Sequence, residues 1–148
     1  MFSFGISQEL NLSFSQHISC SKDYKPLSCF SYNSNNILFQ KKTNSKSCDL
    51  KVNVFDSHLD EVKRFNVVLK DEKFLGIRNI FNEIYLFTSF DNGIETTLKY
   101  RELDITSNFL SSKNLFVEKN KSGYSSNYIL GEKTFEDKFH FLVELPFQ

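Results

Sequence analysis

The sequence contains no tryptophan and no alanine, and only five glycines and two prolines among its 148 residues. Because alanine has the highest helix propensity, its absence disfavours long helices. Phenylalanine, tyrosine, valine and threonine suit β-strands, and phenylalanine alone occurs 17 times. The preference for Phe, Asn, Lys and Tyr codons indicates an AT-rich genome, such as that of an organelle, a reduced genome or a virus. That bias can explain the phenylalanine excess without a ligand.

An excess of charge of either sign is also absent, since 18 Lys and Arg balance 18 Asp and Glu. A general nucleic-acid binder needs an excess of basic residues to displace counterions from phosphates, and so does a protein that docks on an anionic membrane. We therefore expect neither nucleic acid nor a membrane as a partner. The sequence has no long apolar run, and Gln8 and Glu9 interrupt the apolar N-terminal residues. We therefore expect no signal peptide and no transmembrane segment. The length predicts one domain, residues 1–148.

The chain also lacks the usual motifs of metal and nucleophile sites. Its three cysteines, Cys20, Cys29 and Cys48, have no CxxC spacing, and His17-x-x-Cys20 is the only close pair of histidine and cysteine. A structural zinc site needs four clustered ligands, so we expect no metal. The thiols are expected to be reduced, which suits a cytosol or an organelle stroma. No glycine-rich phosphate loop and no GxSxG motif occur.

The dominant pattern is an alternation of apolar and polar residues, typical of strands with one buried face. We expect strands within residues 10–15, 30–32, 50–54, 65–69, 115–118, 127–130 and 138–145. About eight to ten short strands at a spacing of roughly 8–12 residues indicate a barrel or a sandwich. A closed barrel of about eight strands can hold one small ligand.

The strongest local signal is a hairpin of residues 84–90 and 94–101 around Asp91-Asn92-Gly93. Asn-Gly suits a type I′ turn, which needs two positive φ angles. The apolar phase changes after Arg101, which predicts a β-bulge there. Residues 40–47 are interpreted as a polar loop and residues 70–73 as a solvated, mixed-charge turn. Asp56 is expected to cap a short turn at residues 59–62.

Four stretches also carry a family resemblance. Residues 51–56 form a predicted strand that ends in Phe55 and Asp56, and residues 64–71 form a strand that leads into an acidic turn. Residues 85–100 form the hairpin that ends in Tyr100, and residues 109–115 combine an aromatic, serines and Asn114-Leu115. In this order they resemble the S-type phycobiliprotein lyases, over about half of the chain.

The resemblance implies a single antiparallel β-barrel of the lipocalin or fatty-acid-binding-protein type. It implies a chaperone-like lyase that binds an open-chain tetrapyrrole, a bilin, and helps to attach it to a cysteine of a phycobiliprotein subunit. The implied location is the cytoplasm or the plastid stroma, and a homodimer stays open. No cofactor other than the bound bilin is implied.

The ligand-binding residues that we expect from the resemblance are Phe55, Asp56, Arg78, Tyr100, Arg101 and Asn114. A bilin needs one or two cations for its propionates, for which Arg78 and Arg101 are the candidates, and Asp56 would accept hydrogen bonds from pyrrole N–H groups. The Asn-Leu-Arg-Leu-Arg run of the family reads Asn-Leu-Phe-Val-Glu at residues 114–118. Catalytic residues therefore stay unassigned, and whether the chain is an enzyme stays open.

Two alternatives remain at this point. One is a non-enzymatic β-sandwich or barrel that serves in protein interaction or assembly, viral or organellar. The other is an OB-type barrel for single-stranded nucleic acid, which requires a basic stripe among exposed aromatic residues. An interior binding site distinguishes the ligand-binding barrel from a solid sandwich.

Overall fold

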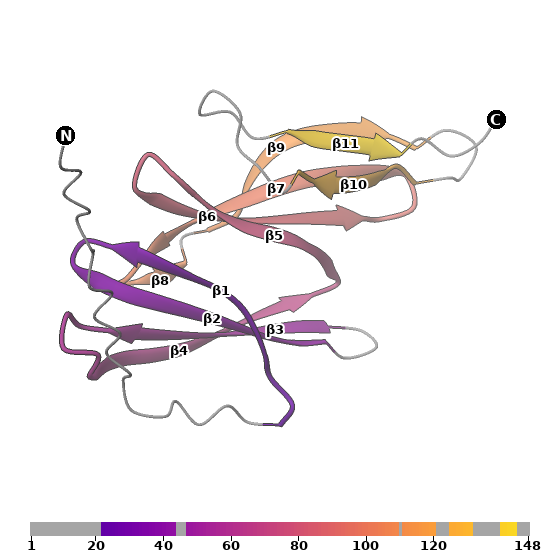
Figure 1. The fold of residues 1–148 in the computed structure, drawn as a ribbon. Coiled ribbons are helices and arrows are strands. Elements are labelled where there is room, and N and C mark those ends of the chain that lie inside the picture. Colours follow the sequence, from indigo (N-terminus) through magenta and orange to yellow (C-terminus); the bar gives the residue numbers. More distant parts are fainter. Residues whose placement is uncertain (1–21, 44–46, 110, 121–124, 132–139, 145–148) are drawn as a thin grey trace, which may run out of the picture.

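The computed structural model describes residues 22–43, 47–109, 111–120, 125–131 and 140–144, which form strands and turns and no helix (Figure 1). The expected all-β, antiparallel fold with little helix is confirmed for these residues. The first sheet contains β1 (Lys25–Tyr32), β2 (Asn35–Thr43), β3 (Ser47–Phe55) and β4 (Glu61–Lys70), in that order. Among the described residues, no helix is long and apolar enough to cross a membrane.

The second sheet is also an antiparallel meander. It contains β5 (Glu72–Ile80), β6 (Glu83–Asp91), β7 (Glu95–Asp104), β8 (Asn108–Phe109) and β9 (Lys113–Lys119), and β8 and β9 both pair with β7. A separate hairpin consists of β10 (Asn127–Leu130) and β11 (Phe141–Glu144). Within the described residues, none of these three sheets closes into a barrel, so the expected single barrel is not confirmed.

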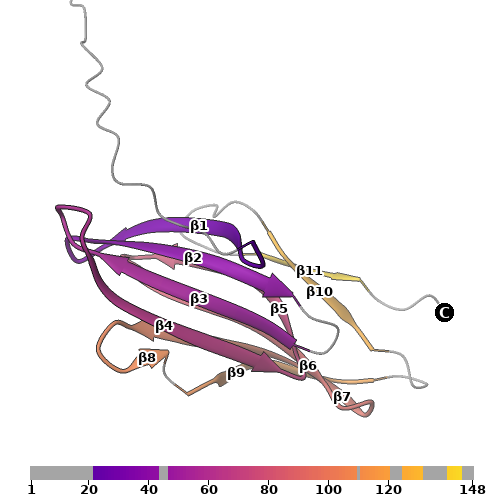
Figure 2. The same ribbon diagram turned by 90° about the horizontal axis from the view of Figure 1, so that it is seen from below.

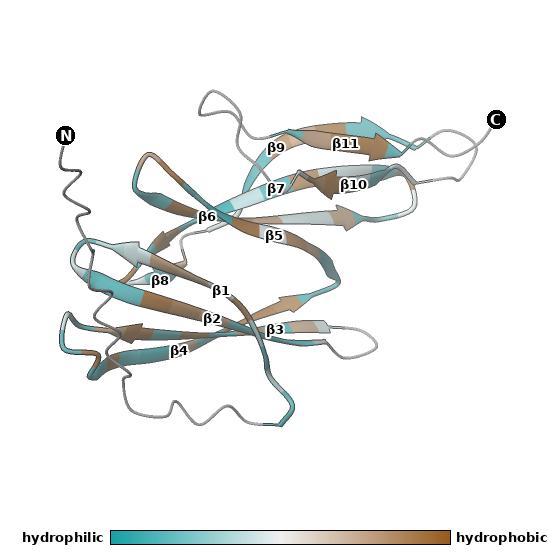
Figure 3. Ribbon diagram, viewed as in Figure 1, coloured by the Kyte–Doolittle hydropathy of each residue, from teal (hydrophilic) through white to brown (hydrophobic). Residues whose placement is uncertain are grey.

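The main core lies between the two sheets, and we call the sides that face each other their inner faces (Figures 1 and 2). Apolar residues that are fully or almost fully buried come from both sheets: Ile37, Phe39, Leu50, Val52, Val54 and Leu69 from the first, and Ile77, Ile84, Leu86 and Leu103 from the second. They occupy alternate positions along each strand, as the pleat requires. Figure 3 shows apolar stretches in both sheets and in β10.

The β10–β11 hairpin covers the opposite side of the second sheet, its outer face. Phe87 of β6 and Leu130 of β10 are buried there, and the rings of Phe87 and Phe141 meet edge to face at 5.4 Å. Tyr128 donates a hydrogen bond to Glu118 of β9. Burial of Tyr128 and this carboxylate raise the pKa of its phenol to about 12. The central strand β6 is thus buried on both faces, with Leu86 on the inner side and Phe87 on the outer side.

Short links and side chains hold the two sheets against each other. β5 follows β4 after a single turn residue, Asp71, whose φ angle is 59°. Lys63 of β4 donates to the carbonyl oxygens of Ile105 and Thr106 beyond β7. At the other edge, the side-chain amide of Asn79 in β5 lies 3.5 Å from the carbonyl oxygen of Ser31 in β1.

The predicted strands that fall on described residues are confirmed. Residues 10–15 lie outside the described part, and so do residues 138, 139 and 145 of the predicted last strand. The side chain of Asp56 caps a turn as expected, because its Oδ1 accepts the backbone N–H groups of His58 and Asp60. The turn ends before Val62, which belongs to β4.

The hairpin between β6 and β7 forms, but the predicted type I′ turn is wrong. Gly93 has a φ angle of 85°, whereas Asn92 is not among the residues with positive φ. The Asn92 side chain instead accepts the N–H groups of Ile94 and Glu95, which holds a wider loop. Two-residue turns with positive φ at both positions occur at Asn33-Ser34 (46° and 63°) and Phe81-Asn82 (51° and 62°).

Three further expectations are wrong. β7 pairs with β6 without a bulge near Arg101, and its register shift with β9 lies earlier, between Leu98 and Lys99. The apolar phase changes because Tyr100 packs on the outer face and Leu103 on the inner face. Residues 44–46 of the loop expected at residues 40–47 lie outside the described part, and the others are strand, since residues 40–43 lie in β2 and Ser47 begins β3. The turn expected at residues 70–73 contains only Asp71, and Glu72 is a partly buried strand residue.

Candidate functional site

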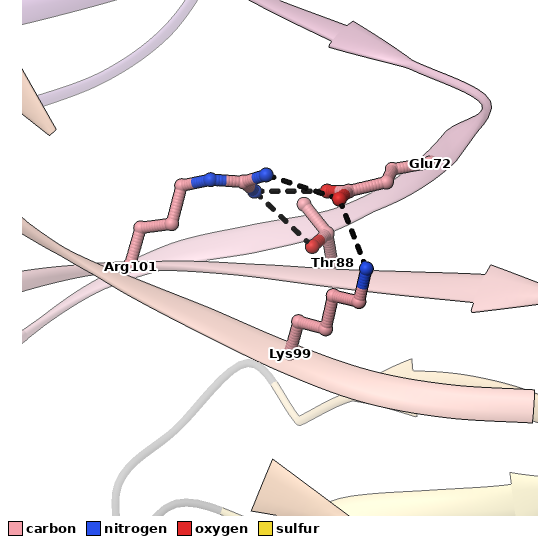
Figure 4. A network of polar contacts seen from close by, with 4 residues as sticks. All are labelled: Glu72, Thr88, Lys99 and Arg101. Carbon is pink, nitrogen blue, oxygen red and sulfur yellow. Dashed lines mark hydrogen bonds and ion pairs between the residues drawn. The ribbon is translucent and has the colours of Figure 1, made fainter. Parts of the chain in front are cut away.

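A polar cluster lies on the inner face of the second sheet, and we call its members, Glu72, Thr88, Lys99 and Arg101, the Glu72 cluster (Figure 4). Arg101 approaches the two carboxylate oxygens of Glu72 through two nitrogens, at 2.8 and 3.0 Å. Lys99 Nζ lies 3.4 Å from the same carboxylate, and Arg101 also approaches Thr88 Oγ1 at 3.4 Å. The cluster joins three neighbouring strands, β5, β6 and β7.

The strand register explains why these side chains meet. Thr88 follows Leu86 by two residues on β6, and Arg101 and Lys99 precede Leu103 by two and four residues on β7. Because Leu86 and Leu103 belong to the inter-sheet core, alternation puts the polar residues on the same inner face. Glu72 reaches this face two residues before Phe74, which also packs against the core.

The charges of the Glu72 cluster are largely removed from water. The side chains of Glu72, Arg101 and Lys99 are 10%, 17% and 19% exposed. Burial alone would raise the pKa of the Glu72 carboxyl, but hydrogen bonds from Arg101 and Thr88 and the attraction of both cations outweigh it. The pKa of Glu72 is therefore lowered, and the group is a carboxylate at neutral pH.

The cluster holds two cations and one anion. One buried carboxylate neutralises only one of them, and an uncompensated charge away from water is unfavourable. Arg101 has five N–H donors and Lys99 has three, so donors remain after Glu72 and Thr88 are bound. The arrangement can therefore accept a further anion, and a carboxylate matches the planar fork of Arg101.

Aromatic rings flank the charged groups. Lys99 Nζ lies 4.6 Å from the ring centroid of Phe90, and on the facing sheet Lys41 Nζ lies 4.9 Å from the ring centroid of Phe74. Both ammonium groups stand over ring faces, where cation–π attraction is favourable. A ligand with an acid group and a flat apolar body would find both kinds of contact here.

The structure places the expected ligand residues in different locations. Arg101 belongs to the Glu72 cluster. Tyr100 is its neighbour on β7 but points to the outer face, where it packs edge to face against Tyr85 at 6.0 Å. Arg78 is on the outer side as well and donates to the carbonyl oxygen of Gly131. Asn114 is exposed on β9, opposite Lys99 in register.

Phe55 and Asp56 lie far along the first sheet from the cluster. Phe55 pairs with Asn36 near the β1–β2 turn, whereas Ser47, at the other end of β3, pairs with Lys70 next to the β4–β5 corner. Asp56 is engaged in capping its own turn. Of the expected residues, only Arg101 is part of the cluster.

Sequence reasoning missed Glu72, Thr88 and Lys99. Glu72 stands in a Lys-Asp-Glu-Lys run, which has the composition of a solvated turn. The available signal was the spacing of Lys99, Arg101 and Leu103 at every second residue of one strand, which puts two cations on the same face as a core leucine.

Comparison with protein-family models, with curated proteins and with solved structures finds no match to this chain. Over the described residues, no group of three or more His, Cys, Asp or Glu side chains is placed to hold a metal ion. The chemistry of the candidate site is thus that of charged and aromatic side chains on the inner face of one sheet.

Proposed function

We propose that this protein binds an open-chain tetrapyrrole between its two sheets and acts as a chaperone-like lyase for bilin attachment to phycobiliprotein cysteines. The observation that carries the proposal is the Glu72 cluster, with two cations, a single carboxylate and adjoining aromatic rings on an inner face. A bilin has propionates for Arg101 and Lys99 and a flat conjugated body for the aromatic and aliphatic side chains.

In this proposal the two sheets are the two sides of one lipocalin-like barrel. The support is that one residue, Asp71, joins β4 to β5, and that Lys63 of the first sheet reaches carbonyl groups beyond β7. The Phe65 and Phe109 rings, from β4 and β8, also meet at 6.4 Å. These contacts place the unpaired edge of β4 beside residues 105–109 of the second sheet.

The protein's part in the reaction is to hold and shield the bilin. The thiol of the acceptor phycobiliprotein adds across an exocyclic carbon–carbon double bond of the bilin. The sulfur forms a thioether bond to one carbon, and the proton goes to the neighbouring carbon of that double bond. No oxidant or reductant is required, so the chain needs only to fix the bilin conformation and keep other nucleophiles away.

The test is an absorbance titration of the purified protein with phycoerythrobilin. We expect a saturable red shift with a sharpened band. Arg101→Ala should weaken binding about tenfold, because a charge-assisted hydrogen bond of about 1.5 kcal/mol is lost. Arg64→Ala is the matched control, since Arg64 is an exposed arginine paired with Glu61. Thermal unfolding would establish that both variants are folded.

Unchanged affinity in Arg101→Ala would exclude this cluster as the bilin site. Lyase activity is tested separately, by mass spectrometry of an acceptor subunit incubated with bilin in the presence and absence of the protein. If the protein binds bilin but makes attachment neither faster nor more selective, it is a bilin carrier and no lyase.

A second candidate, a non-enzymatic interaction or assembly module, is favoured by Phe81. This residue is 77% exposed at the β5–β6 turn and has a φ angle of 51°, an unusual conformation for a bulky side chain. Strained, exposed residues are often functional. A wild-type protein whose bilin spectrum stays that of the free pigment would favour this reading.

A further inference from the structure

Lys41 of β2 lies on the first sheet and faces the second sheet, which carries the Glu72 cluster. It follows the core residues Ile37 and Phe39 by four and two positions, and it pairs in register with the buried Leu50. Its ammonium stands over Phe74, which is two residues from Glu72 on the same face of β5. Lys41 therefore belongs to the inner face of the first sheet, near the corner where β4 leads into β5.

Lys41 lacks an acidic partner among the described residues. The contact that the structure shows for its ammonium is the Phe74 ring, and no described carboxylate lies within ion-pair distance. Burial raises the pKa of the nearby Cys48 thiol, and the charge of Lys41 opposes that rise. Lys41 is a partly buried residue, and an ammonium that lacks an acidic partner among the described residues is incompletely compensated.

The residue opposite Lys41 increases this imbalance. Lys25 of β1 is its register partner, and like charges that face each other across two strands repel. Further along the second sheet, Glu95 and Lys119 also pair in register and add no net charge. Among the described residues near this corner, Lys41, Lys99 and Arg101 are accompanied by one carboxylate, that of Glu72, so positive charges outnumber negative ones there by two.

We propose that Lys41 is a second carboxylate anchor, so that the ligand is a dicarboxylate whose acid groups bind on opposite sheets, one at Arg101 and Lys99 and the other at Lys41. The inference rests on the proposed ligand site and specifies the charge of the ligand. Two carboxylates match the two uncompensated cations, and the body between them would lie against Phe74 and Phe90. Arg78, whose guanidinium is engaged with Gly131 on the outer side, would have no part in binding.

The experiment compares biliverdin with its monomethyl and dimethyl esters, which remove one and both negative charges from the same pigment. For the wild-type protein we expect the affinity to fall about tenfold with each ester, because each carboxylate makes its own charge-assisted contact. In Lys41→Met the diacid should bind about as weakly as the monoester binds to the wild type. Methionine keeps much of the apolar stem, so the strand should remain folded.

Lys42→Met is the matched control, because Lys42 is the next residue on β2 and is paired with Asp23 away from the inner face. It should bind all three pigments as the wild type does. If Lys41→Met also binds them with wild-type affinities, Lys41 is no anchor, while the bilin function stands. Equal binding of the diacid and the diester by the wild type would overturn the dicarboxylate claim as well.

A second probe separates failure of the inference from failure of the bilin proposal. Hexadecanedioate and hexadecanoate differ in one terminal carboxylate and contain no pyrrole. Tighter binding of hexadecanedioate that is lost in Lys41→Met, together with no binding of biliverdin, would support the dicarboxylate site and reject the bilin. If the wild type binds neither biliverdin nor hexadecanedioate, the inference is rejected together with the proposed function.

Discussion

β4 of the first sheet and β6 of the second sheet differ in how many of their faces are buried. In β4 of the first sheet, Leu69 is buried in the core while its neighbour Val68 is 63% exposed. In β6 of the second sheet, the neighbours Leu86 and Phe87 are both buried, one between the sheets and the other under the β10–β11 hairpin. A strand with a wet face can keep its charges in water, whereas a central strand covered on both sides cannot. The Glu72 cluster occurs in the second sheet, where one carboxylate is shared by two largely buried cations.

Alanine substitutions at these neighbouring positions test the difference between the sheets. We expect Leu69→Ala, Leu86→Ala and Phe87→Ala each to lower the free energy of unfolding by about 3–4 kcal/mol, since each deletes a buried side chain. Val68→Ala should cost less than about 0.5 kcal/mol because the residue is exposed. Denaturant titration measures all four variants. A Phe87→Ala effect as small as that of Val68→Ala would show that the hairpin does not cover the outer face.

Glu72→Gln tests whether the inner face of the second sheet depends on its one carboxylate. The substitution leaves Arg101 and Lys99 without their anion, so we expect a loss of about 3 kcal/mol at pH 7. The pKa of Glu72 is lower in the folded protein than its ordinary value of 4.5. Its contribution is therefore complete above that value and is lost as the pH falls through the folded-state pKa. The difference in unfolding free energy between the wild type and Glu72→Gln should therefore become smaller as the pH is lowered.

Glu95→Gln is the control for this measurement. Glu95 is on β7 as well, opposite Lys119 in register, and Lys119 is exposed at the edge of the sheet. The two residues are neighbours in register on a solvated edge, where a carboxylate beside a lysine contributes at most about 1 kcal/mol. Equal losses in Glu72→Gln and Glu95→Gln, or a gap for Glu72→Gln that stays constant with pH, would contradict a special role for the buried carboxylate.

The strands of the first sheet could be predicted because polar residues occupy the positions between their core residues. The alternation at Leu50, Val52 and Val54 places each of these residues in the core, as observed. In β7 the same rule was misleading. Tyr100 packs on the outer face and Leu103 on the inner face, so a change of apolar phase that suggested a bulge reports two buried faces instead.

The candidate site was less predictable because its members come from three strands. Arg101 was expected on account of its charge and its place beside Tyr100, but its partner Glu72 is 29 residues away in the chain. Local composition marks Glu72 as a turn residue, and only the pairing of β5 with β6 and of β6 with β7 brings it to Arg101. Lys41 lies in a run that local polarity assigned to a loop, and its inner-face position follows from the register of β2 with β3.

Gly76→Ala tests whether the β10–β11 hairpin packs on the outer face of the second sheet, and it is the most local of these substitutions. It lies at a register shift of β5, with a φ angle of 159°, and a Cβ atom placed there would be 2.7 Å from Leu130 Cδ2. Gly76→Ala must displace the leucine that docks β10, so we expect a loss of about 1–3 kcal/mol.

The cause of that loss can be separated by a double-mutant cycle with Leu130→Ala, which removes the obstructing atom. If the close approach causes the loss, Gly76→Ala should cost clearly less in the Leu130→Ala background than in the wild type. An equal cost in both backgrounds would assign the effect to backbone strain at Gly76 alone. A cost near zero in the wild type would mean that β10 does not pack on β5 as described, and the outer face of β5 would then be exposed to solvent like that of β4.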